Sequence, residues 1–129
     1  MSSTESPSGP GSGPVDVDVE RVDSTIALLI PRGGLDGEQL EYALRLSIET
    51  LVAAGMTGLV VDLRSYAMLD SSGLGALVAS HGDVAETSGV RLVLTGVGQQ
   101  LHRTLSRSML LQVLPVYETV ERASASLRA

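Results

Sequence analysis

A carboxylate and two hydroxyls follow one another in the segment Leu69-Asp70-Ser71-Ser72-Gly73-Leu74-Gly75. Upstream, residues 58–63 form a short apolar, β-branched run that is typical of a buried strand. Downstream, apolar residues from Leu74 onward recur at helical spacing. The hydroxyls are therefore expected beside the unpaired N–H groups at the positive end of a helix, where a phosphate on one of them would be favoured.

Helix capping alone would also select these three residues. Asp70, Ser71 and Ser72 are each able to cap the helix, and spacing by itself favours such a structural role for Ser71. If Ser72 is the cap, Ser71 stays exposed and free to accept a phosphate. Asp70 either acts as a base that orients the Ser71 hydroxyl, or places a negative charge at the positive end of the helix dipole. We favour the second role, because a kinase supplies its own base.

A further carboxylate, Asp36, follows the second expected strand as Asp70 follows the third. Parallel strands open on the same sheet edge, so both carboxylates are expected to flank Ser71. A phosphate adds a charge of about −1.5 to −2, which both would repel. It would point into solvent and change the surface while leaving the fold intact. A cap for the following helix explains Asp36 equally well.

The composition bounds the class of protein. A chain of 129 residues supports one domain with a real core. It has no cysteine, which excludes disulfides, thiolate nucleophiles and cysteine-based zinc sites. A net charge of −6 argues against a nucleic-acid partner. Apolar runs are too short to span a membrane and the first residues do not form a secretory signal, so we expect a cytoplasmic protein.

The helices and strands that position these residues are predicted from hydrophobic periodicity and from Gly, Pro and capping residues at their ends. Residues 1–14 are rich in Ser, Gly and Pro and are predicted to be a disordered tail. A folded domain over 15–127 should then have the order ββαβαβαβα, an α/β fold with one mixed, mostly parallel sheet and packed helices. Strands are expected at 15–20, 24–30 (after an Asp23-Ser24 turn), 58–63, 90–94 and 113–116. Helices are expected around 40–52, 72–87, 101–109 and 120–127.

Other residues offer little chemistry. Gly96-Val97-Gly98 is half of a dinucleotide-binding fingerprint, but Leu101 occupies the place of the third glycine, so turn formation explains it better. His81 lies on an apolar helical stripe and is interpreted as a packed side chain, and His102 has no companion at metal-ligand spacing. No nucleophile elbow is present. We therefore expect neither catalysis nor a cofactor or metal.

Residues 70–75 resemble the phosphorylation loop of bacterial anti-sigma-factor antagonists, STAS-domain proteins whose loop reads Asp-Ser-Ser-Gly-Leu-Gly; all six positions match. Gly33-Gly34-Leu35-Asp36 resembles the family's Gly-Glu-Leu-Asp, and residues 114–121 resemble its usual ending. The resemblance covers roughly 15–127. This chain departs from the pattern at Gly34, where an acidic residue is common, and at Met109, where the turn after the third helix often has glycine.

The resemblance implies a non-enzymatic partner-switching regulator of transcription. Ser71 would be the phosphate acceptor, with Ser72 as the helix cap, and a partner would contact a surface made of Asp36, Asp70, Ser72, Gly73 and Leu74. The implied partners are an anti-sigma factor that is also a serine kinase of the histidine-kinase-like ATPase type, and a serine phosphatase. The alternative is a STAS module that serves as a fixed subunit of a signalling scaffold or lipid-transport complex. A small nucleotide-binding domain is a further alternative.

Overall fold

The computed structural model describes residues 15–34, 37–85 and 89–128, and the expected tail lies outside these ranges. Four strands form one mixed sheet in the spatial order β1-β2-β3-β4. β1 (Val15–Arg21) pairs antiparallel with β2 (Ile26–Gly33), and β3 (Gly58–Asp62) and β4 (Arg91–Thr95) continue the sheet in parallel. The predicted α/β domain with a mixed sheet is confirmed.

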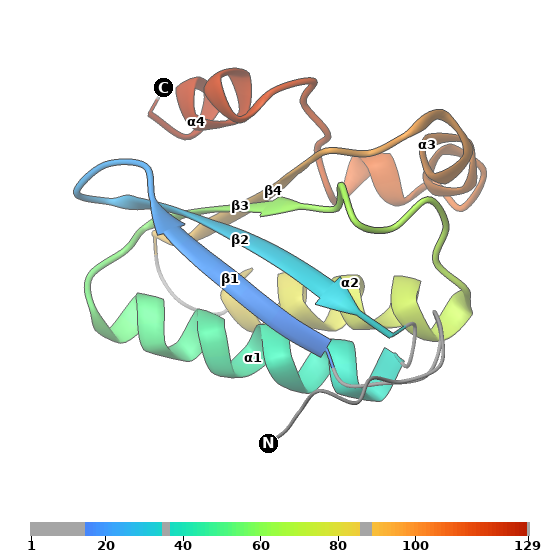
Figure 1. The fold of residues 1–129 in the computed structure, drawn as a ribbon. Coiled ribbons are helices and arrows are strands. Elements are labelled where there is room, and N and C mark those ends of the chain that lie inside the picture. The colour runs from blue at the N-terminus through green and yellow to red at the C-terminus, as the bar shows by residue number, and fades with distance from the viewer. Residues whose placement is uncertain (1–14, 35–36, 86–88, 129) are drawn as a thin grey trace.

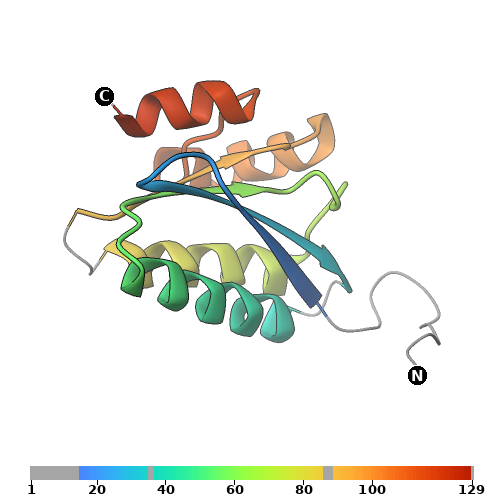
Figure 2. The ribbon, with the colours of Figure 1, turned by 60° about the vertical axis from the view of Figure 1, so that its left-hand side comes forward.

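Helices cover both faces of the sheet (Figures 1 and 2). α1 (Gly37–Ala53) and α2 (Ser71–Ala85) pack side by side on one face, and α4 (Val120–Arg128) lies on the other. α3 (Gln99–Arg107) follows β4, and the short 3-10 helix η1 (Leu110–Gln112) comes two residues after it. None of the helices in the described ranges is long and apolar enough to cross a membrane.

Two-sided burial explains the continuous apolar runs of the inner strands. Successive side chains of a strand point to opposite faces, so Leu59 and Val61 of β3 join the core beneath α1 and α2, while Val60 joins the core beneath α4. On α1, the buried side chains recur at helical spacing: Leu40, Leu44, Ile48 and Leu51. Gly55 ends this region with φ +96°, a conformation that favours glycine.

Most boundaries lie within two residues of those expected, and the differences at β2, at residues 113–116 and at α3 have a physical reason or change the topology. β2 continues through Pro31 to Gly33, because β3 pairs only with residues 26–29 and no β3 partner requires an N–H at position 31. The segment 113–116 forms a single parallel bridge, between Val116 and Leu94, instead of a full strand. α3 ends at Arg107, two residues before Met109.

Met109 is the described non-glycine residue with a positive φ, at +61°. By the resemblance described above, the turn after the third helix often has glycine at this position. A left-handed conformation disfavours a residue with a Cβ, and glycine adopts it freely. The methionine therefore keeps the turn geometry without the residue that suits it best.

Candidate functional site

α2 begins at Ser71 and is capped by Asp70. The Oδ1 atom of Asp70 accepts a hydrogen bond from the Gly73 backbone N–H at 2.9 Å, and its carbonyl accepts one from the N–H of Leu74 at 2.9 Å. This is the geometry of an N-cap. The expectation that Ser72 caps the helix is wrong, because the helix starts one residue earlier and the carboxylate holds the cap position. Asp70 therefore has a structural role.

Capping by Asp70 leaves both serines of the loop available. Ser71 and Ser72 are exposed, and the Ser71 hydroxyl forms no hydrogen bond with another described residue. Among the other expected contact residues, Gly73 is buried and Leu74 is partly buried against the core. The hydroxyl of Ser71 thus stands in solvent at the first residue of a helix, beside N–H groups that favour an added anion.

The beginning of α1 lies against this loop. A Cβ added to Gly37 would be 2.4 Å from the carbonyl carbon and the Cβ of Ser72. Nearby, the buried Tyr66 hydroxyl donates a hydrogen bond to the Gly34 carbonyl at 3.3 Å, and burial raises the pKa of this tyrosine. The structure therefore brings Gly34 and Gly37 close to the segment that runs from Tyr66 to Ser72. Asp36 itself lies outside the described residues, and its position beside Ser71 stays a prediction.

Two large apolar side chains, one before Ser71 in the sequence and one further along α2, are partly exposed. Met68, three residues before Ser71, is 38% exposed, and Val78 of α2 is 39% exposed. Gly75 lies between them in sequence, is exposed, and has open space where a Cβ would stand. The surface that follows Ser71 along α2 thus has an exposed glycine and an exposed apolar side chain, which suits close contact with another protein.

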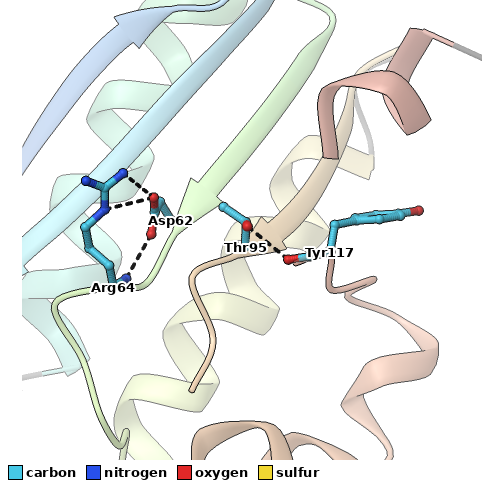
Figure 3. Close-up of polar contacts among 4 residues, drawn as sticks. All are labelled: Asp62, Arg64, Thr95 and Tyr117. Atoms are coloured by element: carbon cyan, nitrogen blue, oxygen red, sulfur yellow. Dashed lines mark hydrogen bonds and ion pairs between the residues drawn. The ribbon is translucent and has the colours of Figure 1, made fainter. Parts of the chain in front are cut away.

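The segment that leads to Ser71 starts at a buried carboxylate that the sequence analysis did not single out. Asp62, the last residue of β3, accepts hydrogen bonds at 2.9 Å from the backbone N–H and from Nε of Arg64 (Figure 3). Beside it, the Thr95 hydroxyl donates to the Tyr117 carbonyl at 2.9 Å. An acidic residue at the end of an otherwise apolar, fully buried strand was the signal that could have revealed this group.

Gly96, His81 and His102 are the other residues of the sequence that could have carried chemistry. Gly96 has φ +70°, which explains it as a turn residue. A groove of about 660 Å³ opens beside it and is lined in part by His102 and Arg103. His81 is partly buried, and its Nδ1 atom has no hydrogen-bond partner within the described part of the chain. No three acidic or histidine side chains of the described ranges gather at a point that could hold a metal ion.

Comparisons with known proteins identify the family that the chain matches and the solved structures that it resembles. The model of the STAS domain family matches residues 16–123. A search of curated protein sequences found no match. Among solved structures, an anti-sigma factor antagonist from Mycobacterium paratuberculosis is similar, with 25% identity and a TM-score of 0.75; the match covers 95% of this chain and 99% of that one.

Two further structures are similar at lower identity, and they show the fold alone. The Thermotoga maritima protein TM1081 has 21% identity and a TM-score of 0.75, with 88% of this chain and 95% of that one covered. The anti-sigma factor antagonist SpoIIAA in its unphosphorylated form has 21% identity and a TM-score of 0.66, with 87% and 96% covered. SpoIIAA of Bacillus has also been solved in a phosphorylated form.

Proposed function

Because the chain belongs to the STAS domain family, we propose that it is an anti-sigma factor antagonist that switches partners on phosphorylation of Ser71. The observation that carries this proposal is the free hydroxyl of Ser71 at the first residue of α2, with the cap supplied by Asp70. Similarity to an antagonist over nearly the whole of both chains supports the same role.

The proposed switch works through surface charge. The partner docks on the exposed surface of the loop before α2 and of α2 itself, where Met68 and Val78 offer apolar contact and Gly75 allows close approach. In phosphorylation, the Ser71 oxygen attacks the γ-phosphorus of ATP, the bond to ADP breaks, and the serine proton passes to a base of the kinase. The phosphate then adds about −1.5 to −2 charge to this surface. A negative group desolvated at an apolar interface disfavours the complex.

The fold itself is expected to tolerate the modification. Ser71 is exposed, so the phosphate has room in solvent. The N-terminal end of α2 attracts the added charge, while the Asp70 carboxylate repels it. In this proposal the protein performs no turnover: an anti-sigma factor with serine kinase activity adds the phosphate and a serine phosphatase removes it, in the cytoplasm.

Mapping the phosphate tests the proposal. Incubation with the partner kinase and ATP should place one phosphate on Ser71, as read by mass spectrometry, and Ser71→Ala should abolish incorporation. Ser72→Ala is the matched control, because Ser72 is also exposed but lies one residue further along the helix. Full incorporation in Ser71→Ala, or a phosphate found mainly on Ser72, would contradict the assignment. A partner that binds the phosphorylated and unphosphorylated forms alike would instead indicate a fixed subunit.

A further inference from the structure

Asp62 is a buried carboxylate whose hydrogen bonds all come from Arg64. Its side chain is 5% exposed. One oxygen, Oδ1, accepts the Arg64 backbone N–H at 2.9 Å, and the other, Oδ2, accepts from Nε and Nη2 of the same arginine (Figure 3). The carboxylate thus holds the main chain two residues after β3 ends, at the start of the segment that leads to Ser71.

The neighbouring strand is shaped to admit this carboxylate. Gly96 directly follows β4, and a Cβ added there would lie 2.0 Å from Oδ1 of Asp62 and 2.9 Å from the Arg64 nitrogen. Any side chain at position 96 would therefore displace the carboxylate from the N–H that it binds. The Leu63 N–H also donates to the Thr95 carbonyl at 2.9 Å. The ends of β3 and β4 are joined at this point.

The rest of the segment is fixed further along. The Tyr66 N–H donates to the Leu63 carbonyl at 2.9 Å, the Tyr66 hydroxyl reaches the Gly34 carbonyl, and Asp70 caps α2. Residues 63–70 thus run from one carboxylate at the end of β3 to another at the start of α2. The direction in which the chain leaves β3 decides where the second carboxylate, and Ser71 after it, will stand.

Stability alone is a poor reason for this arrangement. Burying a carboxylate is costly, and its ion-pair partner, the Arg64 side chain, is 59% exposed. Apolar residues fill the other inward positions of β3. From the paired oxygens and the space left by glycine, we infer that Asp62 is a positioning residue: together with Gly96 it fixes residues 63–70 and so sets the placement of Ser71. The role of Ser71 as acceptor rests on the function proposed above.

Amide hydrogen exchange on the full chain tests the positioning directly and needs no partner. In Asp62→Ala, the amides of residues 64–70 should exchange about tenfold faster than in wild type, because a charged hydrogen bond is lost locally. Any change in the exchange of the β2 amides, which reports on global stability, is subtracted first. Asp62→Asn should restore most of the protection, since its amide oxygen can still accept the Arg64 N–H. Equal changes in the loop and in β2, or no recovery with asparagine, would overturn the inference.

A second variant reaches the same carboxylate from the other strand. Gly96→Ala should speed exchange over residues 64–70 as Asp62→Ala does. Gly55→Ala is the matched control: Gly55 also has a positive φ, at +96°, but nothing lies within 4 Å of its added Cβ. Both variants introduce backbone strain, but only Gly96→Ala places a Cβ against Asp62 and Arg64. The same loop response in both would contradict a specific link between Gly96 and Asp62.

Phosphorylation kinetics test whether the contacts of Asp62 and Gly96 also affect Ser71. If the wild-type protein accepts phosphate, kcat/KM for its phosphorylation should fall about tenfold in Asp62→Ala and recover in Asp62→Asn. An unchanged kcat/KM in a protein whose loop exchanges faster would overturn the positioning role. A wild-type protein that accepts no phosphate would refute the proposed function, while the exchange measurements would still decide whether Asp62 and Gly96 fix the segment.

Discussion

The contact between Gly37 and Ser72 gives a sharp test of how the acceptor loop is built. Replacing Gly37 with alanine places a Cβ 2.4 Å from two carbon atoms of Ser72, one of them in the backbone, and 2.5 Å from its carbonyl oxygen. Non-bonded carbon atoms pack at about 3.5–4.0 Å. Because the backbone cannot rotate away as a flexible side chain would, the start of α1 or of α2 must shift by about 1 Å.

The cost follows from overpacking in a close-packed region. Inserting one carbon where there is no room typically destabilises by about 1–3 kcal/mol. Alanine regains a part of this through its better helix propensity, at most about 1 kcal/mol. We therefore expect the free energy of unfolding of Gly37→Ala to fall by about 1–2 kcal/mol. For a domain of this size, the melting temperature should drop by roughly 3–10 °C.

Gly75→Ala is the matched control for this measurement. Gly75 is also a helical glycine near Ser71, but its added Cβ meets nothing within 4 Å and the residue is exposed. Helix propensity alone should make this variant about 0.5–1 kcal/mol more stable than wild type. Urea unfolding followed by circular dichroism measures both variants. A Gly37→Ala protein as stable as Gly75→Ala would refute the close contact between the two helix starts.

Three further predictions concern separate residues. Met109→Gly should stabilise the protein by up to about 1 kcal/mol in thermal unfolding, because Met109 is 61% exposed and has a left-handed backbone; a loss would contradict the strain. Hydrogen bonds from Thr25 and Arg128 lower the pKa of Asp23, so its ionised form stabilises the fold above the unfolded-state pKa, and this stabilisation disappears as pH falls through the lowered folded-state value. The stability difference between wild type and Asp23→Asn should therefore be present at pH 7 and vanish in acid; a difference independent of pH would refute this. Asp36→Asn should retain wild-type melting but weaken partner binding if Asp36 contacts the partner, whereas unchanged binding would leave only a capping role.

Periodicity was sufficient to predict most of the architecture. The apolar run of β3 and the helical spacing of α1 reflect burial against the sheet, which is a local pattern that the sequence displays directly. The segment 113–116 looked like a strand for the same reason. It bonds the edge of β4 only around Leu94, and no pattern within a short apolar run shows how many of its residues will pair.

The sequence predicted which residues form the loop before α2, residues 69–75, but not which of them caps the helix or what contacts the loop makes. Three successive residues were able to cap α2, and the choice of Asp70 depends on where the helix begins, a difference of one residue that local preferences do not decide. The contacts that Gly37 makes with Ser72 and Gly96 makes with Asp62 join residues far apart in sequence. Such contacts depend on how the helices and strands pack in three dimensions, so only the assembled fold shows why these positions need glycine.

Partner affinity measured before and after phosphorylation tests the central claim most directly. The partner kinase should be titrated calorimetrically, in the presence of a non-hydrolysable ATP analogue, with unphosphorylated protein and with protein phosphorylated only at Ser71. We predict a loss of about a hundredfold in affinity, corresponding to roughly 3 kcal/mol for a charge desolvated at the interface, while both forms keep the same circular dichroism spectrum. Equal affinities for the two forms would contradict the switch.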